Sequence, residues 1–136
     1  MEGGRLLVDT NIISYLLKEN SLARPYLVHL KGNLLFLSFI SVGELYFWAE
    51  DASWGPKRRA HLEEKLRNYI VIPYDYEIAR CYARIAVERK HNGKSIDLHD
   101  AWIAACAIRH GIPLVTHNVK DFEGISFLKI ITEAAQ

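Results

Sequence analysis

Four acidic residues in this sequence occur where predicted helices and strands begin or end, and their side chains are the ones best suited to chemistry. They are Asp9, Glu44, Asp100 and Asp121. If these side chains meet in space, each charge opposes the ionisation of the others, so the cluster either retains protons or binds a cation. Because the ligand atoms would all be oxygen, a hard cation such as Mg²⁺ or Mn²⁺ is favoured over Zn²⁺. Such an ion can polarise a phosphoryl oxygen and generate hydroxide from bound water.

Each acid also has a purely structural interpretation, because acidic and small polar residues cap the N-termini of helices. The candidate caps are Asp9 or Asn11, the pair Ser41 and Glu44, the pair Asp97 and Asp100, and the pair Asn118 and Asp121. Ser41 and Glu44 have the spacing of a capping box, in which the glutamate reaches back to the cap amide. Capping does not require an acid, since serine, threonine or asparagine would serve as well. The recurrence of acids at these positions therefore favours a shared site.

Other polar side chains near the acids are weaker candidates for the same site. Four of them flank the acids and could orient water or substrate, namely Thr10, Asn11, Thr116 and Asn118. Residues of these types are also common in turns and caps, where they need no catalytic role. His99 points about a third of a turn away from Asp100 on a helix, so direct cooperation between the two is not expected.

The hydrophobic pattern predicts an α/β fold. Short aliphatic runs typical of buried strands cover residues 6–8, 34–39, 70–72, 113–115 and 128–131. Apolar residues at three- and four-residue spacing predict helices over residues 11–18, 23–30, 41–50, 56–68, 76–91 and 98–110. Strands separated by helices predict a mostly parallel sheet with helices on both faces. Ligands of such sheets bind at the carboxyl ends of the strands, where the four acids are expected to converge.

Length and composition indicate one globular domain over residues 1–136. The chain is 50% hydrophobic and 24% charged, with no repeat and no linker. No run is long enough to span a bilayer and the N-terminus lacks a signal-peptide core, so a soluble cytoplasmic protein without a membrane partner is expected. A net charge of +1 argues against a general polyanion-coating protein. Cys81, Cys106, Trp48 and Trp102 lie in apolar helical patterns and are predicted to be core or interface residues.

Three blocks of the sequence resemble the PIN-domain family and, within it, the VapC-type ribonuclease toxins of toxin–antitoxin pairs. The blocks read LLVDTNIISYLL, SFISVGELYFWA and DAWIAACAIRHGIPLVTHNVKDFEGI. The first looks like the opening strand and helix of the family, and the second is similar to its S-x-x-E-L element. The third block is the most specific. Together they extend from residue 6 to about residue 125, so the resemblance covers nearly the whole chain.

The resemblance implies roles for individual acids. Asp9, Glu44 and Asp100 match the acids that hold the divalent metal in the family. Asp121 matches an acid of the toxin-type version, whereas Asn118 stands where many PIN domains carry an acid. The fourth position of the site is therefore either Asp121 or Asn118.

The resemblance also implies a fold, a reaction and partners. The implied fold is a three-layer α/β/α sandwich around a mostly parallel sheet. The implied reaction is Mg²⁺- or Mn²⁺-dependent endonucleolytic hydrolysis of RNA phosphodiester bonds, performed by a homodimer that a small cognate antitoxin silences. Thr116 matches a threonine at the sheet edge. Basic residues within 57–67 and 80–94 are then candidates for a rim that steers phosphates toward the acids.

Three alternatives remain open from the sequence. An aspartate-dependent phosphatase would use Asp9 as its nucleophile, although such sites generally place a second aspartate close by, where this chain has Asn11. A catalytically inactive RNA- or protein-binding module could retain the fold without turnover. A histidine-based ribonuclease would cleave RNA without a metal and would resist EDTA.

Overall fold

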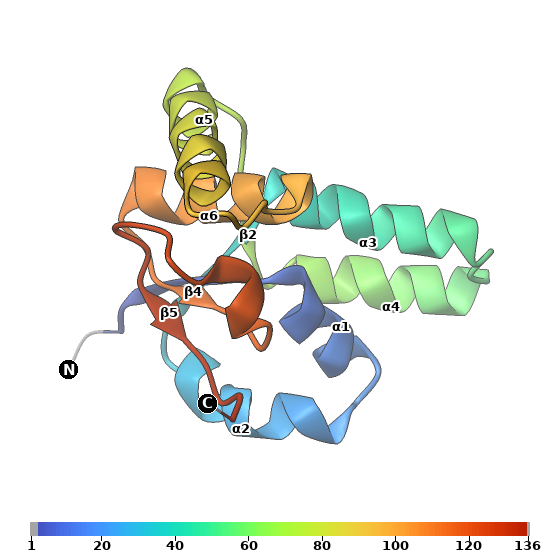
Figure 1. Cartoon of the computed structure of the whole chain (residues 1–136). Coiled ribbons are helices and arrows are strands. Elements are labelled where there is room, and N and C mark those ends of the chain that lie inside the picture. Colours follow the sequence, from blue (N-terminus) through green and yellow to red (C-terminus); the bar gives the residue numbers. More distant parts are fainter. Residues whose placement is uncertain (1–2, 136) are drawn as a thin grey trace.

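A parallel sheet forms the centre of the protein, as the alternation of strands and helices predicts (Figure 1). The structure is a computed structural model that describes residues 3–135. Within that range the sheet has five strands in the order β3-β2-β1-β4-β5, and every neighbouring pair is parallel. The strands are β1 (Arg5–Val8), β2 (Leu34–Ser38), β3 (Ile70–Ile72), β4 (Leu114–Val115) and β5 (Ile130–Ile131).

Each predicted helical stretch forms a helix, although several ends shift. The α-helices are α1 (Thr10–Leu17), α2 (Arg24–Leu30), α3 (Phe39–Asp51), α4 (Pro56–Leu66), α5 (Tyr76–His91) and α6 (Leu98–His110), and two 3₁₀ turns are η1 (Ser21–Ala23) and η2 (Val119–Phe122). Helices α5 and α6 have the predicted bounds. Helix α3 begins before the predicted residue 41 because the Ser38 side chain caps it, accepting a hydrogen bond from the Ile40 N–H at 3.2 Å.

The sheet separates two hydrophobic cores, which makes the protein the three-layer α/β/α sandwich that was predicted. Side chains of a strand alternate between the faces. In β1, Leu7 therefore packs with α5 and α6, whereas Leu6 and Val8 pack with α1, α2, α3 and α4. Helices α5 and α6 lie on one side of the sheet and α1 and α2 on the other (Figure 1). Burial on both faces explains why β1 is apolar from Leu6 to Val8.

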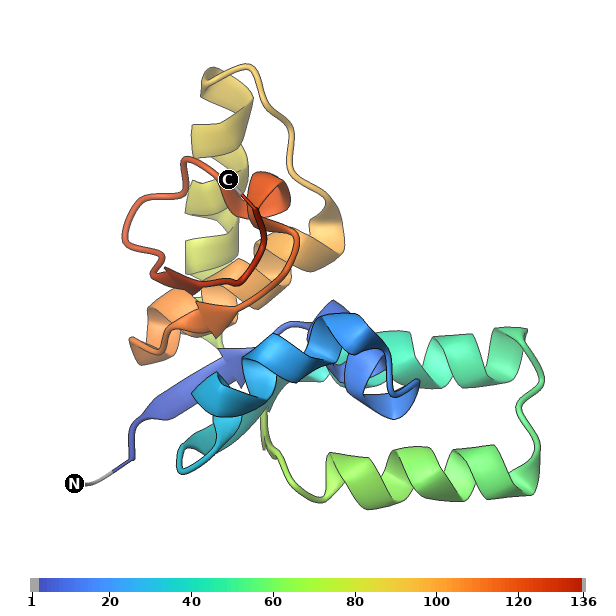
Figure 2. The ribbon, with the colours of Figure 1, turned by 90° about the horizontal axis from the view of Figure 1, so that it is seen from below.

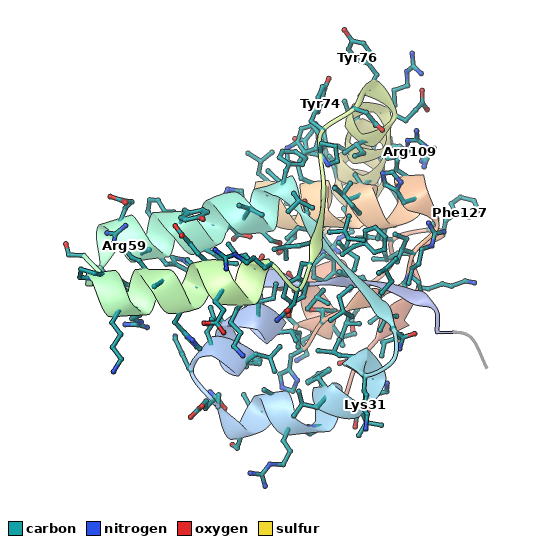
Figure 3. All side chains as sticks on the ribbon, turned by 180° about the vertical axis from the view of Figure 1, so that it is seen from behind. Lys31, Arg59, Tyr74, Tyr76, Arg109 and Phe127 are labelled. Carbon is teal, nitrogen blue, oxygen red and sulfur yellow. The ribbon has the colours of Figure 1, made fainter. Side chains whose placement is uncertain are left out.

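Helices α3 and α4 lie side by side and extend away from the sheet as a pair (Figures 1 and 2). Arg59 of α4 joins them (Figure 3). Its guanidinium donates to the carbonyls of Trp54 at 2.7 Å and Ala49 at 3.1 Å, and it pairs with Glu50 at 2.6 Å. Because these bonds engage Arg59 with the end of α3, this residue is not a free cation of the predicted basic rim.

The predicted core position is confirmed for Cys106 and is wrong for Trp48, which is exposed. Cys106 is fully buried and Cys81 is partly buried, and both are free thiols. Trp102 is half-buried and stacks on Tyr82, with ring centroids 4.5 Å apart and planes inclined by 8°. Trp48 is partly exposed on α3. None of the helices in residues 3–135 is long and apolar enough to cross a membrane.

Candidate active site

The order of the strands reverses between β1 and β4, and polar side chains follow both strands at this point. Asp9 follows β1 and Thr116 follows β4. The Thr116 hydroxyl donates to Asp9 Oδ2 at 2.7 Å, which joins the two strand ends. Asp9 is also the N-cap of α1, because its Oδ1 accepts the Thr10 N–H at 2.8 Å. Asp9 is 4% exposed, and hydrogen bonds hold both of its carboxylate oxygens.

Glu44 reaches the same place from α3. Its Oε1 accepts a hydrogen bond from the Thr10 hydroxyl at 2.8 Å, and that hydroxyl also lies 2.7 Å from the buried Ser41 Oγ. The predicted capping box of Ser41 and Glu44 is therefore wrong, since Ser38 caps α3 and both side chains instead bond toward Thr10. Thr10 thus connects Glu44 to the strand end that carries Asp9.

Helix α6 brings the third acid. Asp97 caps this helix by accepting the His99 N–H at 2.9 Å, and Asp100 lies in the first turn, as predicted. His99 has a role that the sequence did not reveal, because its Nδ1 lies 3.3 Å from Glu44 Oε2. The partner of His99 is therefore Glu44 of another helix rather than the neighbouring Asp100.

The segment after β4 carries the remaining predicted residues. The Asn118 N–H donates to Thr116 Oγ1 at 3.1 Å, but the exposed Asn118 side chain makes no capping bond to η2, so its predicted capping role is wrong. Asp121 lies in η2 with an exposed side chain. Asn11 differs from these residues because its Oδ1 and Nδ2 are buried, and neither has a hydrogen-bond partner within residues 3–135.

The electrostatics of Asp9 reflect its burial. Desolvation raises the pKa of Asp9 from 3.8 to about 6, against the hydrogen bonds from Thr116 and Thr10, which lower it. The charges of Glu44 and Asp121 raise this pKa further. Glu44 of α3 and Asp121 of η2 are therefore close enough to Asp9 for their charges to raise its pKa.

Asp100 shows the stronger shift. Partial burial raises the pKa of Asp100 from 3.8 to about 7, and the charges of Asp9, Asp121, Asp97 and Glu44 raise it as well. In the described part of the chain, no hydrogen bond reaches the carboxylate of Asp100 or Asp121 to offset this repulsion. The negative charge of the acids is consequently not compensated, and a bound cation would neutralise it.

The donor set fits a hard divalent cation. Within residues 3–135, no three acidic, histidine or cysteine side chains already stand close enough to enclose an ion. The acids nevertheless offer only oxygen, repel one another's charge and include carboxylates without hydrogen bonds, and such donors suit Mg²⁺ or Mn²⁺ rather than Zn²⁺. A cation would replace the protons that the raised pKa values of Asp9 and Asp100 retain.

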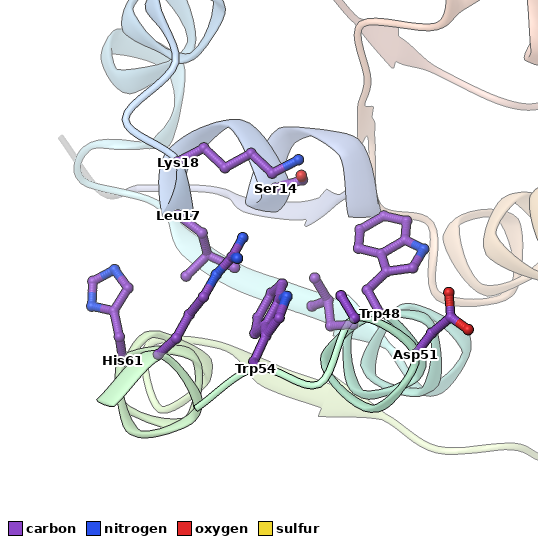
Figure 4. A pocket seen from close by; sticks show the side chains of 10 residues that line it. Ser14, Leu17, Lys18, Trp48, Asp51, Trp54 and His61 are labelled. Atoms are coloured by element: carbon purple, nitrogen blue, oxygen red, sulfur yellow. The ribbon is translucent and has the colours of Figure 1, made fainter. Parts of the chain in front are cut away.

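Two cavities differ in their relation to the acids. A cavity of about 590 Å³ adjoins Glu44 and His99 and is walled by aromatic side chains that include Phe39 and Phe47. A second cavity, of about 330 Å³, lies between α1 and the α3–α4 pair (Figure 4). Its lining includes Trp54, over whose ring the Arg58 guanidinium lies 3.9 Å from the centroid, but none of the four acids.

The protein thus combines a parallel α/β sheet with acidic residues near the point where the strand order reverses. The model of the PIN domain family matches residues 6–128. The chain therefore belongs to the PIN-domain family.

Its relatives within that family are ribonucleases and toxins. The chain is 30% identical over 125 residues to Ribonuclease VapC2 of Haemophilus influenzae, an alignment that covers 92% of this chain and 95% of the relative. It is similar to a chain in the solved structure of VapBC2 from Rickettsia felis bound to a promoter DNA fragment, with a TM-score of 0.84, 25% identity and coverage of 94% and 98%. A toxin–antitoxin complex from Klebsiella pneumoniae also contains a similar chain, with a TM-score of 0.75, 27% identity and coverage of 93% and 96%.

Proposed function

We propose that this protein is a PIN-domain endoribonuclease of the VapC type, the toxin of a toxin–antitoxin pair, which hydrolyses RNA phosphodiester bonds with Mg²⁺ or Mn²⁺. The observation that supports the proposal is the electrostatic coupling of the acids. Burial is the main cause of the raised pKa values of Asp9 and Asp100, and the charges of Glu44 and Asp121 raise both further. The relatives named as ribonucleases support the reaction class. We infer that residues 1–136 act as one domain in the cytoplasm.

Asp9, Glu44 and Asp100 are the residues that would hold the metal, with Asp121 completing the acidic site. When bound, the metal supplies activation of water and neutralises charge on the phosphoryl oxygens. Thr116 and the Thr10 N–H fix the orientation of the Asp9 carboxylate.

Four polar residues around the acids serve to position water or substrate in this proposal. They are Thr10, Asn11, Thr116 and Asn118. The unpartnered amide of Asn11 supports such a role, since a buried amide without a hydrogen bond costs about 1–3 kcal/mol and a bound water or phosphate oxygen would remove that cost. The exposed Asn118 side chain, beside the backbone bond to Thr116, stands free to contact RNA.

RNA is the substrate that the surroundings of the acids suit. The cavity beside Glu44 and His99 has Phe39 and Phe47 in its wall, and Phe47 is 63% exposed. Exposed aromatic rings offer faces on which unpaired bases stack. A phosphodiester at the acids would therefore have an adjoining place for a base.

The aspartate-dependent phosphatase is disfavoured by the state of Asp9. A nucleophilic carboxylate must present an oxygen to the substrate. Both oxygens of Asp9 accept hydrogen bonds, from Thr116 and from the Thr10 N–H, and the residue is buried. Asp9 is therefore better suited to a fixed ligand role than to covalent attack.

Two protein partners belong to the proposal. We infer that the toxin is silenced by a small cognate antitoxin, which the similar chain in a toxin–antitoxin complex supports. We also infer a homodimer. Exposed aromatic side chains at the start of α5 support a protein contact, since Tyr74 is 52% and Tyr76 78% exposed (Figure 3).

The test is an RNA-cleavage assay with the purified chain, with Mg²⁺ and with EDTA, in the presence and absence of the protein encoded by the adjacent gene. We expect cleavage that EDTA abolishes, that excess Mg²⁺ restores and that the adjacent gene product suppresses. Cleavage that resists EDTA and leaves cyclic phosphate ends would support the histidine-based alternative. Tight RNA binding without cleavage in Mg²⁺ or Mn²⁺ would support an inactive binding module.

A further inference from the structure

One basic side chain is buried beside the acidic site although the proposed reaction does not use it. Arg89, near the end of α5, is 5% exposed and is the only buried basic side chain in residues 3–135. Its presence inside the predicted basic segment 80–94 suggested a surface cation, and that interpretation is wrong for this residue. A buried guanidinium requires hydrogen bonds to compensate for lost water.

Backbone carbonyls provide these hydrogen bonds. Arg89 Nε donates to the Lys94 carbonyl at 3.0 Å, and its Nη1 donates to the carbonyls of Asp121 and Glu123, both at 3.0 Å. Within residues 3–135, no carboxylate lies within ion-pair distance of this guanidinium. The side chain therefore serves to hold the backbone of another segment rather than to neutralise an acid.

The segment that Arg89 holds carries Asp121, an acid whose side chain makes no hydrogen bond within residues 3–135. Asp121 lies in the short 3₁₀ turn η2, whose carbonyls are not all satisfied within the turn. Its exposed carboxylate makes no hydrogen bond in the described residues, so its position depends on its backbone. Three contacts hold this backbone. The Asp121 N–H donates to the Asn118 carbonyl at 3.1 Å, Arg89 donates to the Asp121 carbonyl, and the next residue, Phe122, is buried in the core.

We propose that Arg89 is a positioning residue, which fixes the backbone at Asp121 so that the carboxylate faces Asp9 and Asp100. The inference rests on the proposed function, since it assigns Asp121 to the acidic site. A planar guanidinium suits this task because it donates in several fixed directions at once, which a lysine cannot do. Arg89 thus connects the last turn of α5 to the segment that carries Asp121.

A neighbouring contact offers a matched control. Glu88, the residue before Arg89, accepts hydrogen bonds from the Ser126 N–H at 3.0 Å and the Ser126 hydroxyl at 2.5 Å. This contact anchors the same segment beyond Asp121 without touching the turn that carries it. If Arg89 only stabilised the segment, loss of the Glu88 contact should have a similar effect on the acidic site.

The experiment compares Arg89→Lys, Glu88→Ala and Asp121→Asn with the wild type. The Mg²⁺ concentration for half-maximal RNA cleavage, and Mg²⁺ binding to the metal-free protein by calorimetry, are measured for each. We expect Arg89→Lys to weaken both by about tenfold, the loss typical of a residue that supports metal ligands, while Glu88→Ala leaves both near the wild-type values. The double variant Arg89→Lys with Asp121→Asn should bind no more weakly than Asp121→Asn alone, because both changes act through one carboxylate.

Additive losses in the double variant, or equal losses from Glu88→Ala, would overturn the proposal. Hydrogen exchange of the wild type provides a test that needs no variant to fold. We expect the Asp121 amide, which donates to the Asn118 carbonyl at 3.1 Å, to be protected already without metal. Protection of this amide that arises only after Mg²⁺ is added would contradict a preformed position. Failure of the proposed function is seen separately, as wild-type protein that binds Mg²⁺ but does not cleave RNA. Wild-type protein that binds no Mg²⁺ would overturn both proposals.

Discussion

The acidic site has two halves that differ in how their carboxylates are held. In the first half, Asp9 and Glu44 accept hydrogen bonds from Thr116, Thr10 and the Thr10 amide, at 2.7–2.8 Å. In the second half, Asp100 carries a carboxylate that no hydrogen bond reaches in residues 3–135, and the same is true of Asp121. We call these the bonded half and the open half.

The two halves differ in how strongly burial and repulsion oppose the charged form of the carboxylates. Hydrogen bonds to a carboxylate favour its charged form and offset part of the burial of Asp9. Asp100 lacks this help, and its pKa of about 7 is the higher of the two although it is the less buried residue. The bonded half therefore fixes geometry, and the open half is where a proton or a cation is most needed.

The largest effect should come from removing a charge in the open half. Asp100→Asn should lower Mg²⁺-dependent cleavage on the order of 10³-fold, because a metal held by these acids would contribute several kcal/mol to stabilising the transition state. The same change should raise the melting temperature of the metal-free protein at pH 8, since it removes a repelled charge. Kinetic assays and thermal denaturation check both parts. A lower melting temperature at pH 8 would show that the carboxylate stabilises the fold.

The next effect is on stability as a function of pH. The pKa values of Asp9 and Asp100, about 6 and about 7, lie above the value of 3.8 expected in the unfolded chain. The folded metal-free protein therefore binds more protons at these two residues. Their contribution to its stability is fully present below about pH 4 and is lost as pH rises to about 7. For the buried Asp9 this amounts to about 3 kcal/mol.

Urea denaturation between pH 5 and pH 8, with and without Mg²⁺, measures this dependence. Other groups contribute equally with and without the ion, so the difference between the two curves isolates the acids. We expect Mg²⁺ to stabilise the protein more at pH 8 than at pH 5, where protons compete for the same carboxylates. An equal stabilisation at both values would contradict the coupling of proton and metal.

A smaller effect is expected from loosening the bonded half. Thr116→Val keeps the shape of the side chain but removes the hydrogen bond to Asp9 Oδ2. Cleavage should fall by about 10-fold to 100-fold, the range typical of residues that orient metal ligands. Thr132 follows β5, and its hydroxyl accepts the Ala134 N–H at 3.0 Å. Thr132→Val is therefore a matched control outside the acidic cluster, and it should cleave at the wild-type rate. Unchanged cleavage by Thr116→Val would show that Asp9 needs no such support.

The smallest effect should come from His99. Its side chain is 54% exposed and its contact with Glu44 is 3.3 Å long. Exposed pairs of this kind contribute little, so His99→Gln should change cleavage by less than about threefold. A loss above about tenfold would instead indicate that His99 contacts substrate.

The sequence predicted best what depends on neighbouring residues. The bounds of α5 and α6 follow from local hydrophobic periodicity, and Asp9 could be placed at a strand end because three apolar residues precede it directly. The capping box at Ser41 failed because a competing cap, Ser38, lies three residues earlier on the same helix. Local patterns cannot decide between two adequate caps when tertiary packing chooses the start of the helix.

The partners that packing creates could not be predicted. The contact between Glu44 and His99 joins residues 55 apart in the chain, and the bond from Arg89 to the Asp121 carbonyl joins residues 32 apart. A buried arginine has the same local signature as a surface arginine on an amphipathic helix. Only the fold shows that η2 covers this part of α5.

The central claim is that acids at the carboxyl edge of the sheet carry out metal-dependent cleavage of RNA. The most direct measurement is the single-turnover rate of RNA cleavage in Mg²⁺ by Asp9→Asn beside Glu63→Gln, which removes an exposed charge on α4. We expect Asp9→Asn to be folded by circular dichroism and slower on the order of 10³-fold, and Glu63→Gln to match the wild type. Mg²⁺-dependent cleavage by Asp9→Asn at the wild-type rate would contradict the account.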